Sequence, residues 1–265
     1  TGTPICILIP NENTKSKDYN YGIARPGHAD FTAFSKYNGF EDYRGGGHFS
    51  GRVTTGIVAV GAIAISALAK KGIKIGTHIS KCAGVEDSSF ADLENDINLL
   101  SDKMFAVLND EKGEEMIKNI EKASEKGDSV GGALETVVKG LPVGIGEPWF
   151  DSVESVLSHA LFSIPAVKGV EFGAGFSIAD MTGKQANDLF FMDGDTVKTK
   201  TNNAGGINGG ITNGMPILFN VAIKPTPSIF KTQSTVNLSD MTNSEITLKG
   251  RHDACIVPRA AAVVE

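Results

Sequence analysis

The sequence predicts an α+β fold, in which helices pack against mostly antiparallel β-sheet. Apolar residues recur three and four apart in some segments and alternate with polar residues in others, which indicates both helices and strands. The two kinds of segment do not follow the regular strand–helix–strand order of a doubly wound sheet. The chain has 265 residues, which is enough for one large single-core domain or two small ones. Its content of 41% hydrophobic and 21% charged residues is ordinary for a globular protein.

Four segments are predicted to be helices. Residues 54–71 are apolar all round and rich in small side chains, so we expect this helix to be buried. Residues 90–100 and the charged stretch after Gly113 carry apolar residues at helical spacing. Asp151 followed by Glu154 resembles a capping box. We expect the helix that it opens to have an inner face made of Val153, Val156, Leu157 and Ala160.

Four further segments are predicted to be strands, and Pro258 fits the first turn of a helix near the end of the chain. Residues 73–80 alternate between apolar and polar, which predicts a half-buried strand with His78 on its polar side as a solvated or structural residue. Residues 170–178 also alternate. Residues 217–223 are apolar on both faces, which predicts a central strand of a sheet. Ile5–Ile9 is predicted to be a short apolar strand.

The composition of the chain indicates which partners and which cellular compartment to expect for the protein. The net charge of −6 argues against a general nucleic-acid binder, which would usually be basic. Cys6, Cys82 and Cys255 form neither a disulfide framework nor a CxxC zinc site, which fits a reducing compartment. The longest apolar stretch, residues 57–69, is too short to span a bilayer. We expect a cytoplasmic protein with no nucleic-acid or membrane partner, and we expect the chain to be the middle of a longer protein because both ends look cut.

Several common motifs are absent from the sequence. There is no GxGxxG after a strand and no GxxxxGK followed by Ser or Thr, which argues against a dinucleotide fold and a P-loop. HExxH and GxSxG are also missing, which argues against zincins and α/β-hydrolases. Glycine makes up 31 of the 265 residues and gathers in short clusters, where bare backbone can approach a ligand or another strand closely.

Two glycine-containing segments combine fixed cations with a histidine. In Arg25–Asp30, Pro26 and Gly27 favour a turn that brings Arg25 close to His28, a candidate proton donor; the alternative is a capped, purely structural histidine. In Arg44–Arg52, a glycine-rich loop enters a helix, so its N–H groups and two arginines suit an anion. A flexible linker is the alternative for that loop.

Two later segments have structural and functional interpretations that the residues alone leave open. Asn202–Gly210 contains two Gly–Gly pairs, which favour tight hairpins or close packing against a planar ring system. Arg251 and Asp253 are two residues apart, so the carboxylate is expected to stay ionised, either beside a ligand or in a surface salt bridge.

Taken together, these segments resemble the chorismate synthase family over essentially the whole chain. They occur in the family's order and at its intervals, as RPGHAD (25–30), RGGGHFSGR (44–52), GEPWFDS (146–152), AVKGVEFG (166–173), NNAGG (202–206), KPTPS (224–228) and GRHDAC (250–255). The resemblance implies a single domain over residues 1–265, with a helical core sandwiched between antiparallel sheets and assembled as a homotetramer. It implies a lyase of aromatic biosynthesis that eliminates phosphate from 5-enolpyruvylshikimate 3-phosphate, giving chorismate, with reduced FMN and no net redox change. An external flavin reductase and NADP are further partners that it suggests.

The resemblance also carries site residues onto this sequence. His28 matches the histidine that protonates the reduced flavin or its neighbourhood, and Asp253 matches the aspartate that helps flavin N5 act as the base. Arg25, Arg52 and Arg251 match arginines that hold the substrate's phosphate and carboxylates. No metal is implied. The positions that match flavin contacts are His48, Phe49, Ser50, Pro165, Ala166, Gly209, Lys224, Pro225, Thr226, Pro227, Ser228 and Arg251.

The sequence departs from the family pattern in three places. Residues 48–53 replace the commoner Arg-Ser-Ser-Ala-Arg-Glu form, and Pro165 stands where Asn is usual. The family's second catalytic histidine, in a Ser-His-Gly segment, and an early arginine-rich loop would lie upstream of Thr1, and without them we expect turnover to be lost. The alternatives are a non-catalytic FMN- or anion-binding remnant, a glycine-rich structural protein and a flavin oxidoreductase. For the last, no nicotinamide-binding motif is present.

Overall fold

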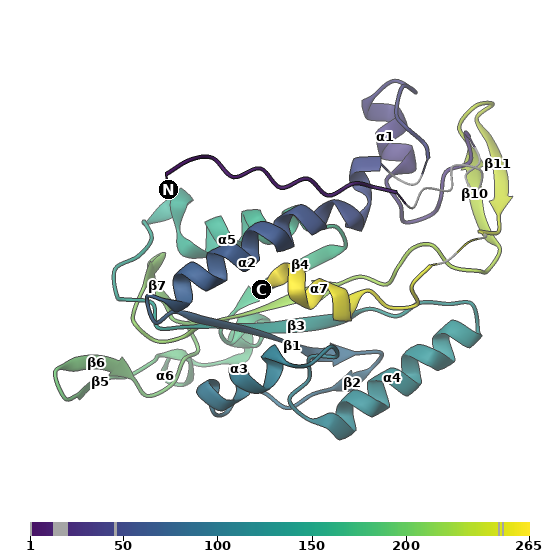
Figure 1. Cartoon of the computed structure of the whole chain (residues 1–265). Coiled ribbons are helices and arrows are strands. Elements are labelled where there is room, and N and C mark those ends of the chain that lie inside the picture. The colour runs from purple at the N-terminus through teal and green to yellow at the C-terminus, as the bar shows by residue number, and fades with distance from the viewer. Residues whose placement is uncertain (1, 13–20, 45–46, 249, 251) are drawn as a thin grey trace.

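A five-stranded antiparallel sheet forms the centre of the protein in the computed structural model, which describes residues 2–12, 21–44, 47–248, 250 and 252–265 (Figure 1). The strand order is β2–β1–β3–β9–β4, and every neighbouring pair is antiparallel. The predicted α+β class with antiparallel sheet is confirmed. These strands are β1 (Lys74–Cys82), β2 (Val85–Glu86), β3 (Gly132–Lys139), β4 (Val167–Phe172) and β9 (Ile217–Ile223).

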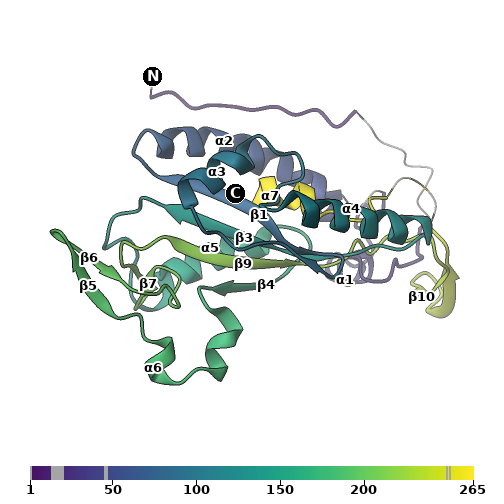
Figure 2. The same cartoon turned by 90° about the horizontal axis from the view of Figure 1, so that it is seen from below.

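The other described strands form three separate hairpins. They are β5 (Phe190–Asp193) with β6 (Thr196–Thr199), β7 (Ile207–Asn208) with β8 (Ile211–Thr212), and β10 (Gln233–Asn237) with β11 (Thr242–Ile246). The two hairpins that contain β5 and β10 stand out from the central sheet, whereas β7 carries the core residue Ile207 (Figure 2). The α-helices are α1 (Asp30–Lys36), α2 (Thr55–Ala69), α3 (Leu93–Ser101), α4 (Asp110–Glu125), α5 (Val153–Ser163), α6 (Gly183–Ala186) and α7 (Val257–Val264). Short 3-10 helices occur at Gly47–Phe49, Gly51–Thr54, Trp149–Asp151 and Gly175–Asp180.

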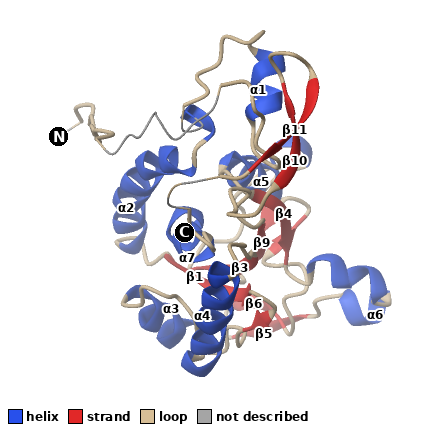
Figure 3. Ribbon diagram, turned by 90° about the vertical axis from the view of Figure 1, so that its right-hand side faces the viewer, coloured by secondary structure: helices blue, strands red, loops and turns tan. Residues whose placement is uncertain are grey.

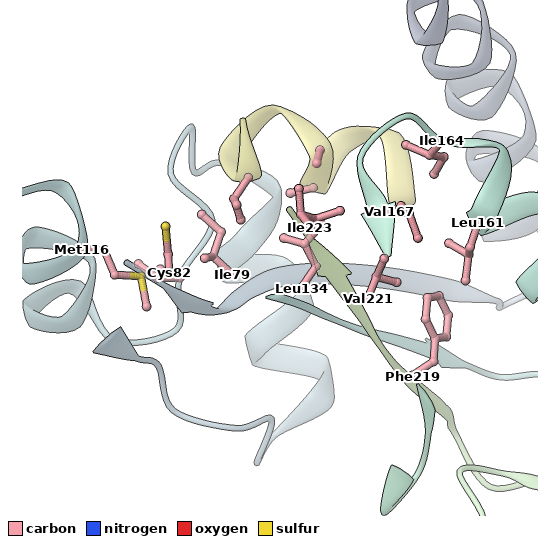
Figure 4. Close-up of a cluster of buried hydrophobic side chains, with 14 of the residues drawn as sticks. Ile79, Cys82, Met116, Leu134, Leu161, Ile164, Val167, Phe219, Val221 and Ile223 are labelled. Carbon is pink, nitrogen blue, oxygen red and sulfur yellow. The ribbon is translucent and has the colours of Figure 1, made fainter. Parts of the chain in front are cut away.

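The hydrophobic core lies on one face of the sheet, under α5 and α7 (Figures 3 and 4). Ile79, Leu134 and Val221 are direct neighbours across β1, β3 and β9, and all three side chains are completely buried. Burying a side chain of this size contributes about 1.5–3 kcal/mol. On the opposite face α3 covers β1 so closely that a Cβ on Gly76 would lie 2.8 Å from Ile97.

Helix α2 lies on the outside of the chain, which corrects the expectation that it is buried. It runs beside α7 at the edge of the molecule (Figure 3), and none of residues 55–69 is buried among the described residues. An apolar helix is buried only where another surface covers it, and α7 and β1 touch one side of α2 only. The helical segment Gly51–Ala69 also has the length and hydropathy of a membrane span, a single-helix match that core helices share.

One predicted strand is not formed, and the strand predicted over residues 170–178 is formed only as far as Phe172, the end of β4. Ile5–Ile9 is an exposed segment outside the sheets that the described residues form. The alternating run after Phe172 leaves β4 and becomes the 3-10 helix Gly175–Asp180, because Gly173 and Gly175 adopt φ values of +56° and +54° that end the extended backbone.

The helix predicted at Asp151 begins two residues later. Ser152 is the N-cap of α5, and its hydroxyl accepts a hydrogen bond from the N–H of Ser155 at 3.1 Å. The stripe that faces the core has a spacing of four and consists of Val153, Leu157 and Leu161. The predicted inner residue Val156 is 55% exposed, and Ala160 is also exposed.

Candidate functional site

The Arg25–His28 segment folds as a tight turn that gathers three ionisable side chains, Arg25, His28 and Asp30, which we call the turn cluster. The N–H of His28 donates to the carbonyl of Arg25 at 3.2 Å, and Gly27 supplies the left-handed φ of +71°. Asp30 is the first residue of α1. Its carboxylate accepts two hydrogen bonds from the Arg25 guanidinium, at 2.7 and 2.8 Å. The predicted proximity of Arg25 and His28 is confirmed.

The turn cluster is largely shielded from solvent, with side-chain exposures of 9% for Arg25, 17% for His28 and 22% for Asp30. Burial alone would raise the pKa of Asp30. The hydrogen bonds from Arg25 and His28 outweigh that effect and hold the pKa of this carboxyl well below its usual range. Asp30 is therefore an ionised acceptor at any physiological pH.

The imidazole of His28 is held through one ring nitrogen only. Nδ1 lies 3.1 Å from Asp30 Oδ1, an acceptor, and 3.1 Å from Arg25 Nη2, a donor. A protonated Nδ1 donates to the carboxylate, whereas an unprotonated Nδ1 accepts from the guanidinium. Among the described residues Nε2 makes no hydrogen bond, so the ring is anchored at Nδ1 while its second nitrogen is available.

Three segments that are distant in sequence converge beside this turn, at the end of the sheet where β9 finishes and β4 begins. The Lys224 ammonium donates to the Gly27 carbonyl at 2.6 Å, and the Lys224 N–H donates to the Ala166 carbonyl at 3.0 Å. A Cβ on Gly27 would lie 3.1 Å from Pro227. The predicted flavin contacts in Pro165–Ala166 and Lys224–Ser228 therefore adjoin the turn cluster.

Thr226 presents an unused hydrogen-bonding group within this convergence. Its carbonyl accepts from the Ser129 hydroxyl at 2.6 Å, but its own Oγ1 is buried without a partner among the described residues. Buried hydroxyls are nearly always hydrogen-bonded in native proteins. The orphaned Oγ1 is thus a feature that a polar ligand would satisfy.

Asp253 lies on the neighbouring segment, and its carboxylate pairs with the Arg259 guanidinium at 2.7 Å. The Ala254 carbonyl accepts from the N–H of Val130 at 2.8 Å. The Ser129–Val130 backbone therefore separates Thr226 from the Asp253 segment. Arg251, predicted to bind both flavin and substrate, lies outside the described residues.

The glycine-rich loop stands apart from the turn cluster. His48 contacts Tyr37 at the far end of α1, with 3.3 Å between Nε2 and the phenol oxygen, and its ring lies 4.3 Å from that of Phe49. Ser50 caps the 3-10 helix that carries Arg52, and the Arg52 guanidinium donates to Asn11 Oδ1 at 3.3 Å. These side chains are exposed or partly exposed in the described structure.

Gly209 is the predicted flavin contact that lies farthest from the convergence. It occupies the turn between β7 and β8, and the next residue, Gly210, accepts a hydrogen bond from Val153 N–H at the start of α5. Pro165 and Ala166 follow the other end of α5. An 11-residue helix is about 16 Å long, so this chain alone does not bring Gly209 to the turn cluster.

A cavity of about 770 Å³ opens at the surface between α5 and β4, and none of the predicted site residues lines it. Its lining consists of Glu154, Ser155, Ser158, His159, Phe162, Ser163, Val170 and Phe172. The candidate site is therefore defined by converging polar groups rather than by this cavity.

The sequence analysis missed a second histidine cluster, made of His78, Asp87 and Glu135. His78 is completely buried in β1, with Nδ1 2.9 Å from Asp87 Oδ2 and Nε2 2.9 Å from Glu135 Oε2. Burial would lower the pKa of His78, but its hydrogen bonds to the two carboxylates outweigh that effect and raise the pKa. The alternation in residues 73–80 placed His78 on the polar side, and no local pattern pointed to Asp87.

The fold and the turn cluster together define an α+β protein in which polar groups from several segments meet at one end of an antiparallel sheet, as in enzymes and anion-binding proteins. The family model for chorismate synthase matches residues 1–265. The chain therefore belongs to the chorismate synthase family, a family of enzymes.

Relatives and a solved structure agree with this assignment. The chorismate synthase of Dehalococcoides mccartyi is 49% identical over 269 residues, covering 100% of this chain and 73% of that protein. That of Pyrococcus abyssi is 48% identical over 267 residues, covering 100% of this chain and 74% of that protein. A crystal structure of chorismate synthase matches with a TM-score of 0.73 and 32% identity, covering 89% of this chain and 66% of that chain.

Proposed function

We propose that the protein catalyses the reaction of its family, the trans 1,4-elimination of phosphate from 5-enolpyruvylshikimate 3-phosphate to give chorismate, with reduced FMN and no net redox change. The observation that carries this proposal is the turn cluster, in which a histidine with an available Nε2 is fixed between a guanidinium and a carboxylate. A fixed imidazole of this kind suits general acid–base chemistry near neutral pH.

The residues beside the turn fit the flavin that the family implies. The orphaned Thr226 hydroxyl, the Lys224 ammonium and the buried Ser228 are the donors expected around a phosphate-bearing cofactor. We propose that Pro165–Ala166 and Lys224–Ser228 hold FMN, with His48–Ser50, Gly209 and Arg251 as further contacts. When bound, reduced FMN supplies a transient electron donor that helps the substrate release phosphate.

The charged side chains of the chain supply binding and protons. Arg25, Arg52 and Arg251 are proposed to hold the phosphate and carboxylates of the substrate, because guanidinium groups bind such anions in a bidentate manner. His28 is proposed to hold and release a proton at Nε2 while Asp30 fixes Nδ1. Asp253, whose carboxylate pairs with Arg259, is proposed as the aspartate that would help flavin N5 act as the base when FMN is bound.

The wider properties that we propose follow the family resemblance. They are a single chorismate synthase domain, a homotetramer, a cytoplasmic location, and an external flavin reductase with NADP as the source of reduced flavin. The apolar side chains exposed along α2, such as Ile57, Val60 and Ile63, support burial of this helix in an assembly.

The proposal is tested by mixing purified enzyme, made from the complete gene, anaerobically with reduced FMN and 5-enolpyruvylshikimate 3-phosphate, and following the release of chorismate and phosphate. We expect turnover that disappears when the flavin is left oxidised. His28→Asn should abolish most of this turnover, whereas the matched control His159→Gln, at an exposed histidine of α5, should not.

Two other outcomes decide against the proposal in different ways. Tight FMN binding without turnover, in enzyme made from the complete gene, would support the alternative of a non-catalytic FMN- or anion-binding protein. Neither FMN binding nor turnover would overturn the proposed function altogether. FMN binding is measured independently of turnover, by fluorescence titration and by the rise in melting temperature with added flavin.

A further inference from the structure

Cys82 and Cys255 are 173 residues apart in sequence, yet their sulfur atoms lie 3.5 Å from each other. Cys82 is the last residue of β1, and Cys255 lies two residues before α7. Both are free thiols. A disulfide has an S–S length of about 2.05 Å, so the two sulfurs are in contact and need only a small approach to form a bond.

A β-bulge places Cys82 on this side of the sheet. The pairing of β1 with β3 shifts between Ile79 and Lys81, so that Ile79 and Cys82 both face the core although they are three residues apart. Cys82 pairs with Gly132, where a Cβ would lie 2.2 Å from the Lys81 carbonyl. The bulge and this glycine together let the Cys82 thiol reach the segment that leads into α7.

The two thiols have different surroundings. Cys82 is fully buried beside Met116 (Figure 4), and its hydrogen bond with Cys255, together with burial, raises the pKa of its thiol. Cys255 is partly exposed. The hydrogen bond from Cys82, assisted by one from the Val257 N–H at the start of α7, lowers the pKa of Cys255. Cys82 is thus shielded from solvent, whereas Cys255 is partly exposed and has the lower thiol pKa of the two, although burial and Asp253 act against the lowering.

We propose that Cys82 and Cys255 form a redox-active dithiol site, which small-molecule disulfides oxidise to an intramolecular disulfide. The Cys255 thiolate attacks one sulfur of the small disulfide, which breaks the S–S bond, forms a mixed disulfide on Cys255 and releases one small thiolate. Cys82 gives up its proton and attacks the Cys255 sulfur, which releases the second small thiolate. Two protein thiols lose two electrons and two protons, and one small disulfide becomes two small thiols.

The resulting bond would join the end of β1 to the segment that carries His252 and Asp253. That segment already contacts Val130 through the Ala254 carbonyl and Phe230 through the His252 ring, whose centroids are 5.6 Å apart. The disulfide would fix this segment covalently to the sheet. This inference rests on the thiol geometry and does not depend on the proposed reaction.

The test uses a Cys6→Ser background, which removes the exposed third cysteine. The folded protein is equilibrated in buffers with increasing ratios of oxidised to reduced glutathione, quenched with an alkylating reagent, and analysed by intact mass and peptide mapping. We expect a Cys82–Cys255 peptide pair, the loss of two hydrogen atoms in intact mass, and a melting temperature above that of the reduced protein.

Two single variants test the order of attack, and circular dichroism confirms that each is folded. In Cys82→Ala, the mixed disulfide on Cys255 cannot be resolved, so glutathione should remain attached there. In Cys255→Ala, the buried Cys82 should stay unmodified. The proposal is overturned if both thiols stay reduced in oxidised glutathione while the protein is folded, or if Cys82 reacts as fast without Cys255 as the exposed Cys6 does in the unmodified chain.

Discussion

The two histidine clusters of this protein contain similar residues, but their imidazole rings have different hydrogen-bond partners. His78 has a carboxylate oxygen 2.9 Å from each ring nitrogen, so both nitrogens must carry protons to be satisfied. His28 has an acceptor and a donor at Nδ1 and an available Nε2, so both of its protonation states are satisfied. The comparison teaches that a carboxylate beside a histidine does not by itself indicate catalysis. The hydrogen-bond partner of the second ring nitrogen decides whether that nitrogen is available for proton transfer.

The surroundings of the two clusters reinforce this difference. The His78 and Asp87 side chains are both 0% exposed and join β1 to the loop before α4, where Asp87 also accepts from the N–H groups of Leu108 and Asn109. The turn cluster instead lies at the end of the sheet, beside the converging flavin-site candidates. We therefore assign the His78 cluster to stability, whereas proton transfer remains the role that we propose for the turn cluster.

The largest predicted effect on stability comes from breaking the buried cluster. Asp87→Asn leaves the charge of His78 without one of its two counterions, and in either orientation of the amide its NH2 group faces at least one donor that Asp87 now accepts from. Breaking a buried ion pair in this way lowers the free energy of unfolding by about 3–5 kcal/mol. Urea denaturation of the variant and the parent protein measures the difference.

Glu94 provides the matched surface control, because it bridges Lys74 of β1 and Lys139 of β3 across the same two strands. Solvent screens these exposed pairs, so Glu94→Gln should change the stability little. Equal losses for Asp87→Asn and Glu94→Gln would show that burial does not distinguish the two clusters.

The largest predicted effect on activity comes from the other histidine. His28→Asn removes the proton held at Nε2, and losing a general acid or base lowers kcat by about 10²–10⁴-fold. Because His28 lies outside the core, the free energy of unfolding should change far less than in Asp87→Asn. Steady-state kinetics on enzyme made from the complete gene measures kcat, and a variant with unchanged kcat would remove His28 from the mechanism.

A smaller loss is predicted for Asp30→Asn, which leaves His28 in place but weakens its anchor. The substituted amide would keep an acceptor oxygen without the charge that holds Arg25 and His28. We expect kcat to fall by roughly tenfold to a hundredfold, equivalent to one hydrogen bond to a charged group. The affinity for FMN, measured by fluorescence titration, should stay the same. A fall in FMN affinity with unchanged kcat would give Asp30 a binding role instead.

Much of the fold was predictable because local periodicity reports which faces are apolar. The helices at Leu93–Ser101 and Asp110–Glu125 and the central strand Ile217–Ile223 follow such patterns. Periodicity does not report whether a partner surface exists, which is why α2 was predicted to be buried and is exposed. It also does not report that glycines with positive φ end the alternation after Phe172.

The candidate site was predictable where its residues are close in sequence. Arg25 and His28 are joined by one turn, so Pro26 and Gly27 predicted their contact. The pairing of Lys224 with Gly27 joins segments 197 residues apart, and that of Cys82 with Cys255 joins segments 173 residues apart. Only the register of β1, β3 and β9 brings such residues together, and one sequence does not specify that register.

The pH dependence of the free energy of unfolding should differ between the two clusters. For His78, the change is expected as pH rises into the alkaline range. Its pKa is raised in the folded state above the unfolded value of 6.5, so its contribution is complete below pH 6.5 and is lost as pH rises through the folded pKa. Within that window the loss is about 1.4 kcal/mol per pH unit. The difference in unfolding free energy between the parent protein and His78→Gln should shrink accordingly. A difference that stays constant from pH 6 to pH 9 would contradict the buried imidazolium.

The smallest predicted effect is the acid response of the turn cluster, which has the opposite sign. The pKa of Asp30 is lowered below the unfolded value of 3.8, so its contribution is present above pH 3.8 and is lost as pH falls through the folded pKa. Comparing the parent protein with Asp30→Asn cancels the other carboxyl groups that titrate in acid. The two proteins should become equally stable at low pH, because a protonated Asp30 is as neutral as asparagine. Since this carboxylate is partly exposed, solvent keeps the effect smaller than that of His78. A difference that persisted in acid and shrank toward alkaline pH would mean that the turn cluster behaves like the buried one, and the contrast between the two clusters would fail.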